Sequence, residues 1–232
     1  MTESIKIISA KEFLKKYKKP EQKKVWDNIS EPWEEFRNKP VSIISDFLKD
    51  KKGLVVDFGC GNARNMIANN NLTYYGIDFS SKQIENAIFR TEKEHINAIF
   101  FQEDISKLNK EIFKDEMFDY GLFVATLHCL DTPQKREKAL LEFYRILKRK
   151  GEAIITVWNS EDSRFNLVKN HGDIYMSWKK NGKTYYRYYY LYNKKEFISL
   201  IESVGFLIIE FYNNNSKDRF VRKNWIVHVK KE

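Results

Sequence analysis

The fold is set by the stretch Val55-Val56-Asp57-Phe58-Gly59-Cys60-Gly61-Asn62-Ala63-Arg64. A short apolar run of buried-strand character passes into two glycines spaced one residue apart, and a helix start is expected after them. Glycines at such a place allow a tight turn and let a ligand lie against the main chain. The amide groups that open the next helix would then face the ligand. The stretch therefore predicts a strand, a ligand-binding turn and a helix, with ordinary strand-turn-helix packing as the alternative.

A carboxylate closes the next predicted strand. Asp78 ends the segment Tyr74-Tyr75-Gly76-Ile77-Asp78 and follows Asp57 by twenty-one residues. At that place it can accept hydrogen bonds from both ribose hydroxyls of a nucleoside. A dinucleotide is disfavoured, because its fingerprint needs a third glycine where this chain has Arg64. The pattern instead resembles motif I of class I S-adenosylmethionine-dependent methyltransferases.

The composition indicates one domain with extensions. The chain has 232 residues, a formal net charge of +9 and 15% aromatic residues. A basic surface rich in rings suits a nucleic acid, since lysines neutralise phosphates and rings stack on unpaired bases; lysine enrichment for solubility is the alternative. Cys60 and Cys129 are too few for a disulfide framework or a four-ligand zinc site, so no metal is expected. A reducing, cytoplasmic compartment is the expected setting. No apolar run approaches a membrane span.

The predicted organisation is a helical N-terminal extension over residues 1–50 and an α/β domain over residues 51–232. The aromatic end of the extension is expected either to cover the ligand site as a lid or to pack on the sheet. Residues 159–184 are polar and predict an irregular, mobile loop or a substrate-facing insertion. Residues 185–192 predict a strand whose tyrosines alternate between two faces; base stacking is the functional interpretation and β-packing the alternative.

The remaining segments complete the sheet. The third strand, residues 98–105, ends at Asp104, which is expected to meet the adenine amino group, and at Ile105, which is expected to supply an amide and an apolar contact; a helix N-cap is the alternative for Asp104. His128 follows the fourth strand at its carboxyl end, where open α/β sheets place chemistry, although a structural role is equally open. An amphipathic helix is then expected over residues 134–150, with Gly151 as its stop. A fifth strand and a terminal antiparallel pair follow. The pattern predicts an α/β, Rossmann-like seven-stranded sheet of order 3-2-1-4-5-7-6.

The chain resembles the tRNA wobble-uridine carboxymethyl methyltransferases over residues 25–229. This family methylates the carboxylate of 5-carboxymethyluridine in the anticodon loop. The similar blocks are the preface 25–29 with Arg37 and Lys39, Leu127-His128 with Arg136, Tyr186-Arg187-Tyr188-Tyr189-Tyr190-Leu191-Tyr192, and Asn224-Trp225. The chain departs from the family at Cys129, which replaces the second of two adjacent histidines.

The resemblance implies S-adenosylmethionine as cofactor, a tRNA anticodon loop as substrate and a small zinc-containing activator subunit as obligate partner. The residues expected to bind the cofactor are Asp57, Gly59, Gly61, Asp78, Asp104 and Ile105. The residues expected to act in catalysis are His128, Arg37, Arg187, Asn224 and Trp225. The activator is expected to pair with the edge of the third strand at Ile99, Phe100 and Phe101; burial of that edge under a local loop or helix is the alternative.

The expected chemistry is alignment rather than proton abstraction. A carboxylate acceptor is already a nucleophile at pH 7, so the site must orient it and exclude water. Arg37 or Arg187 is expected to hold one acceptor oxygen, His128 and Asn224 to orient the acceptor or uracil, and Trp225 or Tyr189 to stack on the base. For an amine or hydroxyl acceptor, His128 becomes a general base. Two rival functions remain: methylation of a small molecule, and a catalytically silent RNA-binding scaffold of the same fold.

Overall fold

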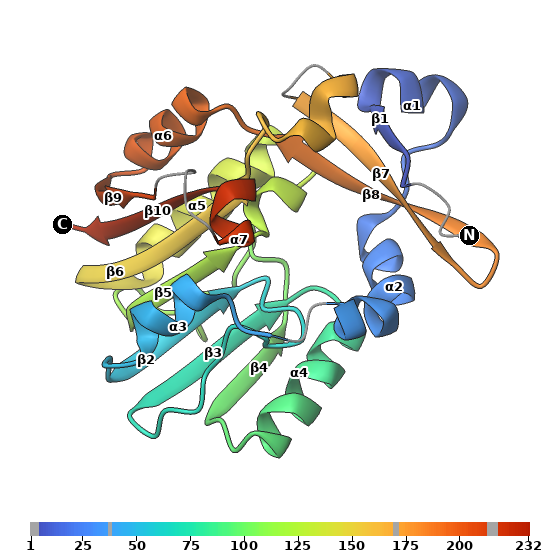
Figure 1. Ribbon diagram of the computed structural model, residues 1–232. Coiled ribbons are helices and arrows are strands. Elements are labelled where there is room, and N and C mark those ends of the chain that lie inside the picture. Colours follow the sequence, from blue (N-terminus) through green and yellow to red (C-terminus); the bar gives the residue numbers. More distant parts are fainter. Residues whose placement is uncertain (1–4, 37–38, 169–171, 213–217) are drawn as a thin grey trace.

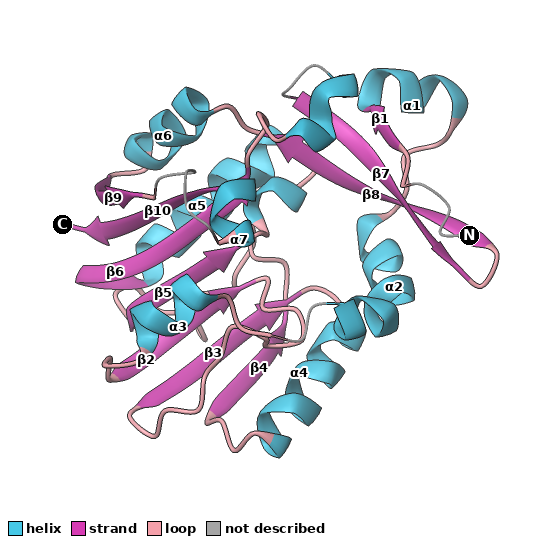
Figure 2. Cartoon of the chain, viewed as in Figure 1, coloured by secondary structure: helices cyan, strands magenta, loops and turns pink. Residues whose placement is uncertain are grey.

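A computed structural model describes residues 5–36, 39–168, 172–212 and 218–232. Within these residues it holds a larger mixed sheet with helices on both faces and a smaller antiparallel sheet beside it (Figures 1 and 2). The larger sheet consists of β2 (Gly53–Phe58), β3 (Leu72–Asp78), β4 (Ala98–Gln102), β5 (Phe118–Val124), β6 (Leu147–Trp158), β9 (Phe206–Phe211) and β10 (Asn224–Lys231). Its order is β4-β3-β2-β5-β6-β10-β9, which confirms the predicted order.

The helices are α1 (Ala10–Lys16), α2 (Gln22–Phe36), α3 (Ser42–Leu48), α4 (Ser81–Lys93), α5 (Pro133–Ile146), α6 (Lys194–Ser203) and α7 (Arg219–Lys223), with 3₁₀ turns η1 (Leu127–Cys129) and η2 (Ser163–Val168). Polar side chains begin several of them. Ser80 accepts a hydrogen bond from the Gln83 amide at the start of α4, and Thr132 does the same for α5, whose first residue is Pro133. These are the ordinary N-cap and first-position preferences of helices. Within the described residues, no helix has the length and apolar character needed to cross a bilayer.

The core is divided by the larger sheet into two apolar layers. Successive side chains of a strand point to opposite faces, so Val56 and Phe58 join one layer while their neighbour Val55 joins the other. The first layer packs under α5, where Phe58 meets Phe143 with ring centroids 4.9 Å apart. The second layer packs against α3. Because both faces are covered, the central strands read as nearly continuous apolar runs.

The helix predicted over residues 134–150 ends earlier than expected. α5 stops at Ile146, and Leu147 already pairs with Phe118 of the neighbouring strand. Strand pairing wins over helical periodicity here because Lys148 bonds Asp119 at 2.7 Å and Leu147 is fully buried. Gly151 therefore lies inside β6 rather than serving as a helix stop.

Two further expectations were wrong, and both concern the smaller sheet. Its strands are β1 (Ile7–Ser9), β7 (Gly172–Lys180) and β8 (Lys183–Leu191), in the order β1-β7-β8. The N-terminal extension is thus not wholly helical, and the predicted irregular loop contains a nine-residue strand. The two-residue turn Asn181-Gly182, with φ of 49° and 74°, joins β7 to β8. Asn-Gly between two strands is a strong hairpin signal, and it was the signal overlooked in the sequence.

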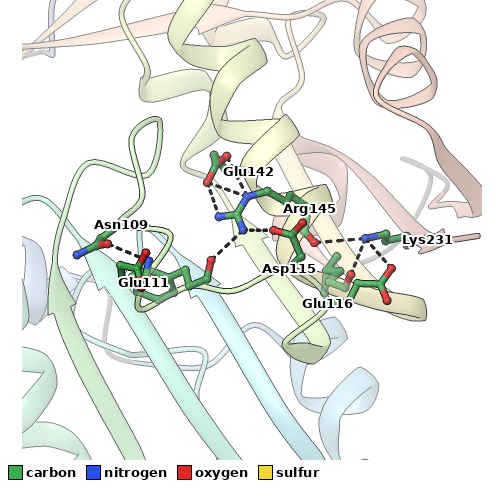
Figure 3. A network of polar contacts seen from close by, with 9 residues as sticks. Asn109, Glu111, Asp115, Glu116, Glu142, Arg145 and Lys231 are labelled. Carbon is green, nitrogen blue, oxygen red and sulfur yellow. Dashed lines mark hydrogen bonds and ion pairs between the residues drawn. The ribbon is translucent and has the colours of Figure 1, made fainter.

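Ion pairs stabilise the end of the larger sheet that lies opposite the carboxyl ends of its parallel strands (Figure 3). Arg145 bonds Glu142 at 2.6 Å, Asp115 at 2.6 Å and the Phe113 carbonyl at 2.8 Å. Lys231 donates to the Leu147 carbonyl at 2.8 Å. These contacts tie the end of α5, the loop before β5 and the C-terminal strand together. They stabilise the sheet at a place remote from the glycine turn.

Candidate active site

The turn after β2 needs glycine at two positions for different reasons. Gly59 has φ of +67°, and a Cβ there would lie 2.2 Å from Cγ2 of Thr126. Gly61 has φ of +54°, but a Cβ there would meet nothing closer than the Gln83 side-chain oxygen at 3.7 Å. Gly59 is therefore required by close packing, whereas Gly61 keeps an open space next to the chain. Such an open backbone surface is what a bound ligand requires.

The helix expected after this turn is replaced by turns through residues 60–71, all of which the structure describes. Ala63 adopts a left-handed φ of 58°, and short-range bonds join Ala63 to Cys60 and Met66 to Ala63. A left-handed alanine interrupts helical geometry. The ligand-facing amides thus come from a loop instead of a helix start.

Asp78 lies at the carboxyl end of β3 and is held by backbone amides. Its Oδ2 accepts from the Gly61 amide at 3.0 Å and its Oδ1 from the Ser80 amide at 2.9 Å. Burial raises the pKa of Asp78 to about 6, while the amides of Ser80 and Gly61 act in the opposite direction. Ser80 in turn donates through Oγ to Asp27 of α2 at 2.6 Å. The acid predicted to bind ribose is therefore fixed in place, and the neighbouring Ser80 holds the N-terminal extension through Asp27.

Asp57 is buried beneath the turn. Its Oδ2 accepts no hydrogen bond from any described residue. Burial raises the pKa of Asp57 to about 7, the charge of Asp78 raises it further, and Arg64 lowers it. An uncompensated buried carboxyl is costly unless a donor or cation reaches it. The position fits a cationic ligand above the glycine turn, such as the amino group and sulfonium of S-adenosylmethionine.

We expect the ligand-free protein to lose unfolding free energy as the pH rises from about 4 to about 7. Asp57 and Asp78, with pKa values raised to about 7 and about 6, keep their protons where the unfolded chain has released them. The folded state then binds more protons, so a stabilisation that is complete below about pH 4 is lost as the pH passes 7. Thermal melts across this range measure it. Carboxyls of lowered pKa such as Asp119 act in the opposite direction, so the variant Asp57→Asn is needed to isolate the effect of Asp57. Its melting temperature should fall less steeply with rising pH than that of the wild type. An identical pH profile would contradict the assignment.

Two adjoining cavities lie at the carboxyl ends of the strands. The first encloses about 770 Å³ of space, open solvent included, and the second about 1440 Å³. Both are lined by Gly59, Asp78, Phe79, Thr126 and Cys129. The first continues along the glycine turn to the rings of Trp26, Trp158 and Tyr189, and the second continues to Asp104 and Ile105 under the α1–α2 connection. An elongated nucleoside ligand can therefore span both, with Asp78 at their junction.

Five of the six expected cofactor residues line the cavities, and Asp57 lies beneath the turn outside both linings. Asp104 accepts through Oδ1 from the amide and the hydroxyl of Ser106, at 2.9 and 2.7 Å. This is a side-chain turn of the Asx kind and not the alternative helix N-cap. Ile105 is 5% exposed. Both residues line the second cavity, and their contact with adenine stays a prediction.

The histidine predicted for catalysis lies behind the first cavity. His128 of η1 is fully buried and packs on Trp158 and Tyr189, with ring centroids 5.0 and 5.6 Å away. Trp158 and Tyr189 contact each other at 4.0 Å and line the cavity. Arg187 is 2% exposed, and its guanidinium carbon lies 5.4 Å from the centroid of the Tyr189 ring. His128 and Arg187 therefore support the ring wall.

The two C-terminal candidates line neither cavity. Trp225 is 3% exposed and donates its indole N–H to the Tyr192 carbonyl at 3.0 Å, inside the core. Asn224 donates to the Phe220 carbonyl at 2.7 Å and is paired with Trp158, a lining residue of the first cavity, in the β10–β6 ladder. Arg37 lies outside the described residues.

Asn62, Gln83 and Thr126 line the first cavity and were not expected there from the sequence. Trp26, which belongs to the segment expected to form a lid or to pack on the sheet, also lines it. The side-chain oxygen of Gln83 is buried and has no hydrogen-bond partner among the described residues. Arg64 also lines the cavity, although in the sequence it served only as evidence against a dinucleotide site. The positions of these residues could have identified them as lining residues, since Asn62 and Arg64 continue the glycine turn and Thr126 follows β5.

Cys129 borders both cavities at the place of the missing family histidine. Its thiol donates to the Ala125 carbonyl at 3.6 Å. Burial raises the pKa of Cys129 well above its usual range, and only the charge of Arg187 opposes this. The thiol therefore stays protonated and contributes an apolar contact, not a nucleophile.

The order of the larger sheet, the glycine turn and the acid at the end of the second strand define a class I methyltransferase fold. Residues 49–205 match the family described as a methyltransferase domain. The chain belongs to this family. A SAM-dependent methyltransferase from Methanosarcina mazei shares the fold, with a TM-score of 0.67, 21% identity and coverage of 83% of this chain and 98% of that one.

Two curated relatives confirm the resemblance read from the sequence. The chain is 31% identical over 140 residues to a protein of Xenopus tropicalis named tRNA (carboxymethyluridine(34)-5-O)-methyltransferase, covering 60% of this chain and 21% of that protein. It is 26% identical over 240 residues to a protein of the same name from Schizosaccharomyces pombe, covering 89% and 94%. The chain thus spans about a fifth of the frog protein and nearly all of the fission-yeast one.

Proposed function

We propose that this protein transfers the methyl group of S-adenosylmethionine to the carboxylate of 5-carboxymethyluridine at the wobble position of tRNA. The observation that carries the proposal is the continuity of the two cavities across Asp78. The second cavity offers Asp104 and Ile105 to the base of a nucleoside donor, and the first runs along the glycine turn to rings that suit a pyrimidine base. The relatives described above bear names that state this reaction.

The donor supplies an electrophilic methyl group, and the residues of this chain position and shield the acceptor. Trp26, Trp158 and Tyr189 form an apolar wall that excludes water and presents ring faces to a base. Arg64 lines the same cavity and supplies a cation for the acceptor carboxylate. An arginine that holds one carboxylate oxygen leaves the other available for attack. No proton needs to leave a carboxylate at pH 7, so no general base is required.

The variant His128→Ala is expected to lower kcat about tenfold to a hundredfold while retaining the affinity for S-adenosylmethionine. Removal of the imidazole loosens Trp158 and Tyr189, which it packs against at 5.0 and 5.6 Å, and misalignment of an acceptor is costly in rate. Single-turnover rates and calorimetry measure the two quantities. His128→Phe keeps a ring and should recover most of the rate; if it is as slow as His128→Ala, a direct polar role replaces the packing role.

The chemistry of the product tests the proposal directly. A methyl ester is hydrolysed by mild alkali, whereas methyl groups on nitrogen, carbon or ribose oxygen are not. Purified protein is incubated with methyl-labelled S-adenosylmethionine and tRNA that carries the free acid, with and without extract from its own cells. We expect label in tRNA that mild alkali releases as methanol. Alkali-stable label would identify another acceptor, and no label under either condition would exclude tRNA.

The activator subunit belongs to the same proposal. In the described residues β4 is an edge strand, as expected. Phe100 and Phe101 pack on the core, while Ile99 is 44% exposed, and Ile88 and Phe89 of the adjacent α4 are 41% and 65% exposed. An exposed edge with apolar side chains suits the addition of a strand from a second chain. Both cysteines are free thiols, which suits the cytoplasmic setting that is also proposed.

The partner can be tested by affinity purification of the tagged chain from its own cells. A small zinc-containing protein should co-purify, with zinc measured in the eluate. Ile99→Lys should lose it, whereas Leu207→Lys on the opposite edge strand β9, where Leu207 is 48% exposed, should keep it. Equal recovery with both variants would place the partner elsewhere.

A further inference from the structure

The positive charge of the chain is concentrated in the smaller sheet and in the segment that covers it. Residues 5–24 contain eight lysines and two acidic residues, and residues 172–192 contain four basic residues and one acidic residue. Together they carry +9, which equals the formal net charge of the whole chain. The rest of the sequence is electrically balanced. Charge segregated in this way is the footprint of a polyanion-binding surface.

A ladder of rings and one guanidinium runs along the inner face of the β7–β8 hairpin. The Arg187 guanidinium carbon lies 5.0 Å from the ring centroid of Trp178 and 5.4 Å from that of Tyr189. The ring of Tyr189 packs against Trp158 in the wall of the first cavity, with centroids 4.0 Å apart and a tilt of 31°. Trp178 is half-buried and lies one residue before the lysines of the turn. Alternating rings and cations suit single-stranded nucleic acid, because bases stack on rings while phosphates meet the cations.

The hairpin turn brings three lysines together. Lys180 and Lys183 are directly paired across the strands, and Lys179 is paired with Thr184. The turn projects away from the larger sheet beyond α2 (Figure 1). Lysines at the tip of a projecting hairpin suit contact with a phosphate backbone.

We propose that the β7–β8 hairpin is an RNA clamp: Lys179, Lys180 and Lys183 bind phosphates of the nucleotides that flank the methylated uridine, and Trp178 stacks on an adjacent unpaired base. The proposal rests on the proposed function, since it assumes that the acceptor in the ring-walled cavity belongs to an RNA. The cavity has room to recognise one nucleotide, whereas the hairpin binds the phosphates of the nucleotides on either side of it.

The test is the salt dependence of binding to a 17-nucleotide anticodon stem-loop, followed by fluorescence anisotropy between about 50 and 200 mM salt. The triple variant Lys179→Ala, Lys180→Ala, Lys183→Ala is compared with Lys49→Ala, Lys52→Ala, Lys114→Ala. The control lysines are exposed and precede β2 or β5, at the end of the sheet opposite the carboxyl ends of its parallel strands. Each lost phosphate contact lowers the slope of log affinity against log salt by about 0.7 to 0.9, so the hairpin triple should lower it by about 2. Its Kd at 100 mM salt should rise about tenfold to a hundredfold, whereas the control triple should match the wild type.

The melting temperature and the affinity for S-adenosylmethionine verify that both triple variants are folded. Equal slopes and Kd values for the two variants would overturn the clamp and leave the lysines as surface charges that protect an edge strand. A wild-type protein that neither binds the stem-loop nor labels tRNA would instead contradict the proposed function. The variant Trp178→Leu adds a second arm: it should weaken binding while leaving the salt slope at its wild-type value, because stacking is lost and no phosphate contact is. An unchanged Kd in Trp178→Leu would remove the stacking half of the proposal.

Discussion

The variant Asp78→Ala is expected to bind S-adenosylmethionine about a hundredfold more weakly than the wild type. The carboxylate is fixed by the amides of Gly61 and Ser80 at 3.0 and 2.9 Å and lies at the junction of the two cavities. Hydrogen bonds to a charged group contribute about 1.5 to 3 kcal/mol each. The loss of two ribose contacts, about 3 kcal/mol, corresponds to about two factors of ten in Kd.

Isothermal calorimetry measures this loss, and two variants complete the series. Asp78→Asn keeps the shape of the side chain and should fall between the wild type and Asp78→Ala. Asp50→Ala removes an exposed acid before β2 and should bind like the wild type. A wild-type Kd for Asp78→Ala would show that the ribose is held elsewhere. No measurable binding by the wild type itself would favour a silent scaffold of the same fold.

Alanine substitutions at the two turn glycines are expected to affect different properties: Gly59→Ala the stability of the fold, and Gly61→Ala the affinity for S-adenosylmethionine. Gly59→Ala should destabilise the protein by about 3 kcal/mol, because it adds left-handed strain and brings a methyl group within 2.2 Å of Thr126. Gly61→Ala carries similar strain but has open space around the added methyl group, so the stability cost should be about 1 kcal/mol. Its methyl group instead occupies space beside the ligand, and affinity for S-adenosylmethionine should fall at least about tenfold.

The hairpin glycine supplies a matched control. Gly182 has φ of +74° and nothing within 4 Å of an added Cβ. Gly182→Ala therefore incurs left-handed strain like that of Gly61→Ala but contacts no cavity. Urea melts and calorimetry on the three variants should show a large loss of stability for Gly59→Ala alone and a loss of donor affinity in folded protein for Gly61→Ala alone. If Gly61→Ala and Gly182→Ala bind the donor equally well, the space beside Gly61 is not part of the donor site.

The larger sheet could be predicted because its signals are local. The apolar runs at Val55–Phe58 and Phe118–Val124, the acid at Asp78 and the turn glycines each fix a piece of backbone without reference to distant residues. The strand order follows from the order of these pieces. The smaller sheet could not be derived in the same way, since β1 and β7 are joined by hydrogen bonds across about 165 residues, such as Ile8 with Tyr175.

The site was predictable where backbone geometry creates it and less so where side chains pack. Asp78 and Asp104 lie where strand ends place them. His128, Arg187 and Trp225 were expected in contact with the acceptor, yet burial puts the first two behind the ring wall and the third in the core. A motif gives the identity and spacing of residues along the chain, but it does not give the direction in which each side chain points. That direction depends on packing against neighbours such as Trp158 and Tyr192.

Formation of the methyl ester of a wobble uridine acid by this chain can be measured in cells. Nucleoside mass spectrometry is applied to tRNA from cells that lack the gene, with cells that carry Asp78→Ala as a second strain. We expect loss of 5-methoxycarbonylmethyluridine and accumulation of free 5-carboxymethyluridine in both strains, reversed by the wild-type gene. An unchanged amount of the methyl ester in the deletion strain would contradict the proposed function.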